Sequence, residues 1–88
     1  MRLIKNHILR KVHDHVVLVP LTDSETDFKG MIALNDTGEF VCRLLEEETD
    51  KDTLAASLAQ AYDIEVAQAA ADVEAFLKEL ESCRMIVG

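Results

Sequence analysis

A chain of 88 residues can bury one small hydrophobic core but is too short for a deep catalytic cavity between two domains. Apolar residues make up 49% of the chain and charged residues 30%, which excludes a disordered segment and is typical of a folded domain. The formal net charge of −8 disfavours binding to nucleic acid or anionic lipid and favours a partner that carries Lys or Arg.

The N-terminal sequence and the two cysteines indicate a cytoplasmic protein. The first residues, MRLIKNHILRK, are positively charged but lack the sustained apolar stretch and the cleavage site of a signal peptide. The longest apolar run, VVLVPL, is far shorter than a membrane span. Cys42 and Cys83 both fall on expected helices, so without an export signal we expect free buried thiols rather than a disulfide.

The first third of the chain is rich in β-branched and aliphatic residues and predicts three short strands. Residues 7–12 (HILRKV) and 15–21 (HVVLVPL) flank a turn near His13 and Asp14. The polar segment 22–30 (TDSETDFKG) is expected to be a loop, and residues 31–34 (MIAL) form the third strand. Because each strand follows the previous one closely, the three favour an antiparallel meander.

The remaining two-thirds of the chain predicts three helices, because apolar residues recur there at helical spacing. The first is expected from about Asp36 to Glu46 with Asn35 as its N-cap, and Thr49 and Asp52 have capping-box spacing before the second. The expected apolar faces are Phe40, Val41, Leu44 and Leu45, then Leu54, Leu58, Ala61 and Tyr62, then Val66, Ala69, Ala70, Val73, Phe76, Leu77 and Leu80. Residues 84–87 add a short extended segment. The order predicts an α+β domain in which a three-stranded antiparallel sheet is followed by a three-helix bundle.

We expect one core to contain residues from all three helices: Phe40, Leu44, Leu58, Val73, Phe76, Leu77 and Leu80.

The sequence contains no arrangement of residues that predicts catalysis or a resident metal. His13 and His15 would point to the same face of one strand, but no third ligand is near, so exposed histidines at the end of a hairpin are expected. Cys42 has no neighbouring His or Lys that would activate it and is expected to be a small core residue. Without a phosphate-binding glycine loop or a Ser-His-Asp arrangement, we expect a protein that is not an enzyme and has no cofactor.

Two features indicate a surface that binds an extended peptide. The strand 31–34 would be the outer strand of the meander, and it contains no Lys or Pro to protect its unpaired backbone groups. The third helix opens with VAQAAAD, whose small side chains permit close approach of another backbone. Packing of these alanines inside the domain is an equally favoured alternative. An open edge beside a shallow apolar helix face suits β-augmentation, in which a peptide adds as a further strand.

The stretch GMIALNDTGEFVCRLLEE, followed by LAQAYDI and ADVEAFLKELESCRMI, resembles the PqqD-like family, named for pyrroloquinoline quinone biosynthesis. The most specific part is LNDTG at residues 34–38, and the resemblance runs from about residue 12 to residue 87. Two departures, EE at 46–47 in place of a glycine and RM at 84–85 in place of Gly-Leu, lie at the ends of elements.

The resemblance implies a single peptide-recognition domain over residues 1–88, with a winged helix-turn-helix-like arrangement. Such a domain binds the leader segment of a ribosomally synthesised precursor peptide between the third strand and the third helix. It presents that peptide to a modifying enzyme, often a radical S-adenosylmethionine (radical SAM) enzyme. The residues expected in the cleft are Met31, Ile32, Ala33, Leu34, Val66, Ala69, Ala70, Val73, Phe76 and Leu77.

Two other functions fit part of the sequence. Three helices and a small sheet would also build a winged-helix DNA-binding domain, but before its end the third helix carries Lys78 against five acidic residues. A third possibility is a module that forms homodimers through the same strand edge, and the sequence leaves it open because self-pairing and peptide pairing use the same backbone groups. We therefore expect a monomer or a weak homodimer that binds neither nucleic acid nor a membrane.

Overall fold

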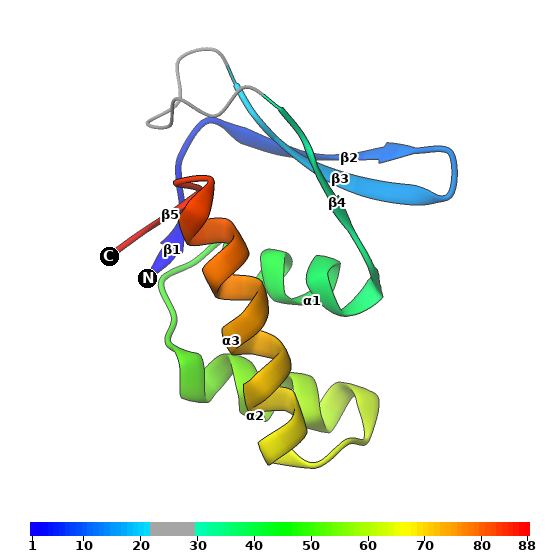
Figure 1. Ribbon diagram of the computed structural model, residues 1–88, viewed down its shortest axis with the longest axis vertical. Coiled ribbons are helices and arrows are strands. Elements are labelled where there is room, and N and C mark those ends of the chain that lie inside the picture. The colour runs from blue at the N-terminus through cyan, green and yellow to red at the C-terminus, as the bar shows by residue number, and fades with distance from the viewer. Residues whose placement is uncertain (22–29) are drawn as a thin grey trace.

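The computed structural model describes residues 1–21 and 30–88, and Figure 1 shows the arrangement of the strands and helices along the chain. The segment expected to be a loop, residues 22–30, lies outside the described residues except for Gly30. In chain order the elements are β1 (Arg2–Leu3), β2 (His7–Val12), β3 (His15–Pro20), β4 (Ile32–Leu34), α1 (Asp36–Leu44), α2 (Lys51–Tyr62), α3 (Val66–Ser82) and β5 (Ile86–Val87).

The three predicted strands form an antiparallel sheet in the order β2-β3-β4, which confirms the meander. The turn between β2 and β3 contains two residues, and the φ of His13 is 57°, the left-handed region that tight hairpin turns use. The predicted turn at His13 and Asp14 is therefore confirmed, and because His13 lies in it, His13 does not share a strand face with His15. Both histidines are exposed, as expected for the end of a hairpin.

Asn35 caps α1 as predicted. Its side-chain oxygen accepts a hydrogen bond from the backbone N–H of Gly38 at 2.8 Å, and α1 ends at Leu44, two residues before the expected position.

The predicted start and apolar face of α2 need correction. Asp50, not Thr49, is the N-cap, because its carboxylate accepts from the backbone N–H of Thr53 at 2.8 Å. Ala61 and Tyr62 are exposed at the end of the helix. The buried face consists of Leu54, Ala55, Leu58 and Ala59. The ring of Tyr62 instead contacts Phe40 on α1 edge to face, with centroids 5.8 Å apart.

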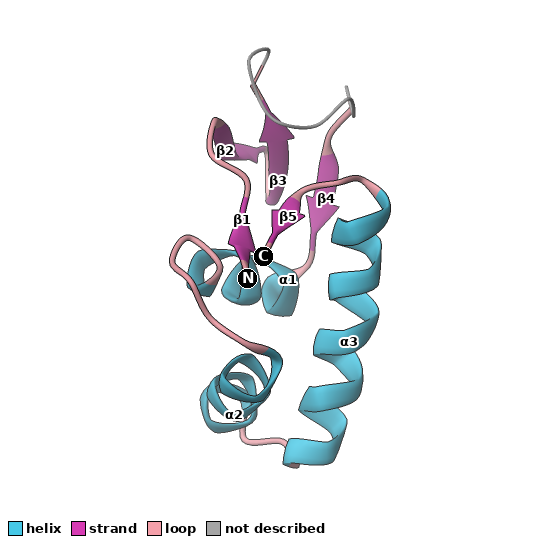
Figure 2. Cartoon of the chain, turned by 90° about the vertical axis from the view of Figure 1, so that its left-hand side faces the viewer, coloured by secondary structure: helices cyan, strands magenta, loops and turns pink. Residues whose placement is uncertain are grey.

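One hydrophobic core joins the three helices to the inner face of the sheet. Of the residues expected in it, Leu58, Val73, Leu77 and Leu80 are fully buried, and Phe40, Leu44 and Phe76 are partly buried and pack against it. Figure 2 shows α3 running alongside α2 and continuing up to the level of the sheet, with α1 between the sheet and α2. Among the described residues, no helix has the length and apolar character needed to cross a membrane.

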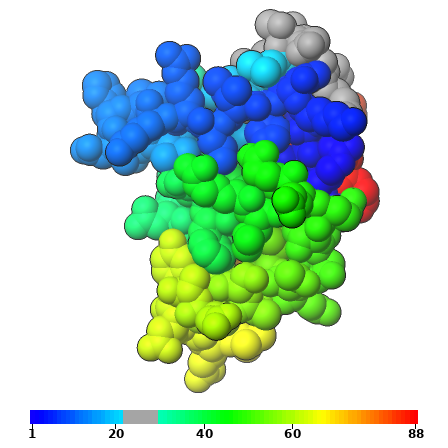
Figure 3. Space-filling view, turned by 180° about the vertical axis from the view of Figure 1, so that it is seen from behind, coloured from blue at the N-terminus to red at the C-terminus, as the bar shows by residue number. Residues whose placement is uncertain are grey.

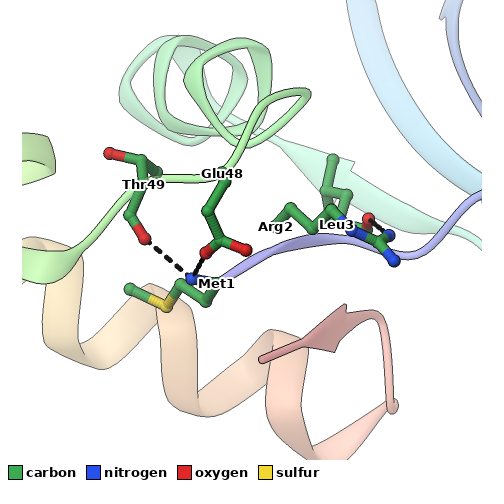
Figure 4. Close-up of polar contacts among 5 residues, drawn as sticks. All are labelled: Met1, Arg2, Leu3, Glu48 and Thr49. Atoms are coloured by element: carbon green, nitrogen blue, oxygen red, sulfur yellow. Dashed lines mark hydrogen bonds and ion pairs between the residues drawn. The ribbon is translucent and has the colours of Figure 1, made fainter.

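The two ends of the chain meet in a second, two-stranded sheet in which β1 pairs with β5. The sequence predicts an extended segment at residues 84–87, but it does not predict β1. The backbone N–H of Leu3 donates to the carbonyl of Leu45 at 2.8 Å, and that of Ile4 donates to the carbonyl of Met85 at 2.9 Å. Figure 4 shows the N-terminal ammonium of Met1 donating to the carboxylate of Glu48 and to the backbone carbonyl of Thr49.

The β2–β3 hairpin extends beyond the helical part of the molecule (Figure 3), so its turn lies far from the joined termini.

Candidate functional site

The open edge of β4 is the first part of the candidate site. In a hairpin with a two-residue turn the closing pair is hydrogen-bonded, and hydrogen-bonded pairs then alternate along each ladder. Residues 16 and 18 therefore direct their backbone groups towards β4, where their partners are Leu34 and Ile32. Ala33, which lies between these two, directs its N–H and C=O away from the sheet. No strand lies beyond β4 in the described part of the chain, so this edge is open to a further strand.

A groove of about 340 Å³ lies next to the C-terminal end of β4, where the start of α1 approaches the middle of α3. Val41, Leu58, Val73 and the half-buried Phe76 form the apolar part of its lining, whereas most of the surface exposed to the groove is polar. The residues that line the groove are Asn35, Thr37, Gly38, Val41, Leu58, Asp72, Val73, Ala75, Phe76 and Glu79.

Gly38 lies on α1 close to side chains of both β4 and α3. A Cβ at this position would lie 3.0 Å from Oδ1 of Asn35, 3.4 Å from Cε1 of Phe76 and 3.6 Å from Cδ2 of Leu34. A larger residue would therefore press on the helix cap and on the wall of the groove. The LNDTG stretch thus has two local functions: Asn35 ends the strand and caps the helix, and Gly38 permits the close approach that shapes the groove.

The structure separates the ten residues that the sequence places in a cleft. Val73 and Phe76 line the groove. Ile32, Leu34, Ala69 and Leu77 are buried in the core, and Met31, Ala33, Val66 and Ala70 are exposed and do not line the groove. Of these exposed residues, Ala33 occupies the open edge of β4. The involvement of these residues in peptide binding stays a prediction.

Sequence reasoning missed most of the groove. On α3 the lining residues Asp72, Ala75, Phe76 and Glu79 recur at positions i, i+3, i+4 and i+7, the spacing of one helical face. This stripe adjoins the buried one but is partly polar, so a search for apolar residues alone does not find it. The other missed residues come from the cap and first turns of α1 and from α2.

Two carboxylates give the groove an acidic rim. Asp72 and Glu79 are exposed lining residues of α3, and within the described ranges neither forms an ion pair. The Asp72 carboxylate accepts only a neutral hydrogen bond, from the side-chain amide of Gln68 at 2.9 Å. In contrast, the basic residues of α1 and α3 are already paired: Arg43 with Glu39 and Lys78 with Glu74.

The thiol of Cys42 is not available for chemistry at this site. The residue is fully buried on α1, and burial raises the pKa of its thiol from 9.0 to about 12, so that it stays protonated near neutral pH. Within the described part of the chain, no three His, Cys, Asp or Glu residues are grouped so that they could hold a metal ion. The arrangement can accept an apolar side chain and an extended backbone.

An open sheet edge beside a groove with both polar and apolar lining defines this molecule as a small α+β domain with a surface shaped for an extended chain. The chain belongs to the PqqD family: the sequence model of that family, described as coenzyme PQQ synthesis protein D, matches residues 14–86. This confirms the resemblance noted in the sequence.

Comparison with solved structures supports the same fold. TbiB1, solved in complex with the TbiA(beta) leader peptide, superposes with a TM-score of 0.78 at 20% sequence identity. The similarity covers 100% of this chain and 96% of the TbiB1 chain. A search of curated proteins finds no match.

Proposed function

We propose that this protein binds the leader segment of a ribosomally synthesised precursor peptide and presents it to a modifying enzyme, such as a radical SAM enzyme, without catalysing a reaction itself. The observation that carries this proposal is the open edge of β4, with the backbone groups of Ala33 directed outwards beside the groove. Membership of the PqqD family and a shared fold with a protein that was solved with a leader peptide support it.

In this proposal the leader peptide adds to the sheet as a strand antiparallel to β4. Its backbone pairs with Ala33 and fixes the register, and one of its apolar side chains enters the groove between α1 and α3. Because the groove lies at the C-terminal end of β4, an antiparallel guest places this side chain on the N-terminal side of the segment that pairs with the strand. In this proposal the protein acts in the cytoplasm as a monomer or a weak homodimer.

The substitution Ala33→Pro tests the pairing directly. It removes a backbone donor that the sheet does not use, and proline is tolerated on an edge strand when its nitrogen faces outwards. We expect the free protein to fold normally and the cognate leader peptide to bind at least tenfold more weakly. Ala33→Val is the matched control, because it keeps the donor and is favourable in a strand. Amide chemical shifts on titration with the leader peptide report both fold and binding.

Two results would contradict the proposal. Ala33→Pro would bind the leader as tightly as Ala33→Val, or the peptide would shift the amides of the β2–β3 hairpin while residues 31–34 and 72–79 stay unchanged. A dimer that forms through the same edge would show itself by a mass that falls on dilution and by a loss of association in Ala33→Pro.

A further inference from the structure

The acidic rim of the groove has a regular geometry. Asp72 and Glu79 are seven residues apart on α3, which is about two helical turns, or about 10.5 Å along the helix axis. Val73 and Phe76 lie between them and contribute the apolar surface. Both carboxylates are therefore on the same side of the helix, one on each side of the apolar part of the groove.

We propose that the groove selects a peptide segment in which one large apolar residue is flanked, two positions away on each side, by Lys or Arg. The proposal depends on the proposed function, since it specifies the peptide that the groove accepts. In an extended strand, residues i, i+2 and i+4 point to the same side, and each residue advances the chain by about 3.3 Å. Residues i and i+4 are then about 13 Å apart. Lys and Arg side chains are long and flexible enough to span the difference between this distance and the separation of the two carboxylates.

The floor of the groove determines the middle residue of this segment. Val41, Leu58, Val73 and the half-buried Phe76 form the apolar part of the lining, and a charged side chain placed against them, rather than against the polar rim, would lose hydration without gaining a partner. A volume of about 340 Å³ lies at the lower end of the range for small-molecule pockets and accommodates a large aliphatic or aromatic side chain.

Local carboxylates, rather than the overall charge of −8, supply the selectivity for basic residues. Glu39 and Glu74 already form ion pairs with Arg43 and Lys78. The two rim carboxylates, in contrast, have no cationic partner among residues 1–21 and 30–88. Because the rim is exposed to solvent, each new ion pair is expected to strengthen binding only about two- to fivefold.

A displayed library of random 12-residue peptides, selected against three forms of the protein, tests the proposal. The forms are the wild type, the rim variant Asp72→Asn/Glu79→Gln, and the control variant Glu65→Gln/Glu81→Gln. The control removes two charges from exposed residues that do not line the groove: Glu65, the N-cap residue of α3, and Glu81 in its last turn. Sequencing of the bound peptides gives the enrichment of each residue type relative to the apolar anchor.

We expect the wild type and the control to enrich Lys and Arg two positions before and after an apolar residue. The rim variant is expected to keep the apolar residue, which shows that its groove is intact, and to lose the basic enrichment. The proposal is overturned if the rim variant still enriches basic residues, or if the control loses the enrichment as well. If even the wild type enriches no peptide, the proposed function fails together with this inference. If all three forms enrich neutral apolar peptides, the proposed function stands and only the inference fails.

Discussion

Cys42 illustrates how a single residue links burial to stability. Its side chain is inaccessible to solvent, and burial, with a smaller contribution from the nearby Glu46, raises the pKa of its thiol from 9.0 to about 12. The unfolded chain loses this proton near the ordinary thiol pKa, whereas the folded chain keeps it to higher pH. The folded state therefore binds more protons than the unfolded state in this interval, and the free energy of unfolding must fall as pH rises.

We expect the contribution of Cys42 to stability to be complete below about pH 9 and to be lost progressively between pH 9 and about pH 12. The slope approaches but does not exceed about 1.4 kcal/mol per pH unit. Urea denaturation at a series of pH values measures it, with Cys42→Ala as the comparison: this variant lacks the titration, and the sulfur atom that it loses from the core lowers its stability by an amount that does not depend on pH. Parallel curves for the two proteins above pH 9 would contradict the assignment.

Other single residues show where local sequence rules hold and where tertiary contacts override them. Asn35 is predictable because an N-cap needs only its own helix, whereas the cap of α2 is not. Thr49 and Asp50 both suit an N-cap chemically, so the local sequence does not decide between them. The backbone N–H of Thr49 donates to the carbonyl of Met1 at 2.8 Å, and Asp50 caps the helix instead. The pairing of segments that are distant in sequence leaves no mark in the local pattern.

At the level of elements, α3 carries two adjacent stripes with different functions. The buried stripe, Ala69, Val73, Leu77 and Leu80, follows from apolar periodicity and was largely predictable. The groove stripe was not, because its members are mostly small or acidic and because the opposite wall comes from α1. Of the two interpretations of the alanines in VAQAAAD, packing inside the domain is correct for Ala69, which is fully buried, while Ala70 is exposed.

The two alanines provide a matched pair of substitutions on one helix. Ala69→Leu inserts three carbon atoms into a packed core and is expected to lower the free energy of unfolding by about 1–3 kcal/mol. Ala70 is exposed to solvent, so Ala70→Leu should change the free energy of unfolding by less than about 0.5 kcal/mol. Because Ala70 does not line the groove, Ala70→Leu should also leave the affinity for the leader peptide unchanged. Urea denaturation and a binding titration check both expectations. A large loss of affinity in Ala70→Leu would mean that the peptide contacts the first turns of α3 rather than the groove.

At the level of the whole molecule, the charges are unevenly distributed. Residues 1–21 contain four Lys or Arg against one acidic residue, whereas residues 30–88 contain thirteen acidic residues against four basic ones. The part of the chain that contains β4, the helices and the groove therefore carries a formal charge of −9 (4 − 13), and residues 1–21 carry +3 (4 − 1). A basic peptide would be drawn to that half, so its association rate should fall as salt screens the attraction.

The N-terminal residues, which the family match over residues 14–86 does not include, complete the core. Leu3 and Ile4 are buried, and the backbone of this segment bonds both to the end of α1 and to the residues before β5. A two-residue strand has too little periodicity to be recognised in the sequence, so β1 becomes visible only when its partner is known. This segment therefore joins the start of the chain to its end and to the end of α1.

Two isoleucines near the start of the chain test the role of this segment. Ile4 is 1% exposed and Ile8 is 39% exposed on β2. We expect Ile4→Ala to lower the free energy of unfolding by about 2–5 kcal/mol, since it leaves a cavity where the first segment meets the helices. Ile8→Ala removes the same atoms from a half-solvated position and should cost less than about 1 kcal/mol. Urea denaturation of both variants measures the difference. Equal losses would mean that the N-terminal segment does not hold the two ends together, and that residues from β2 onwards supply the stability by themselves.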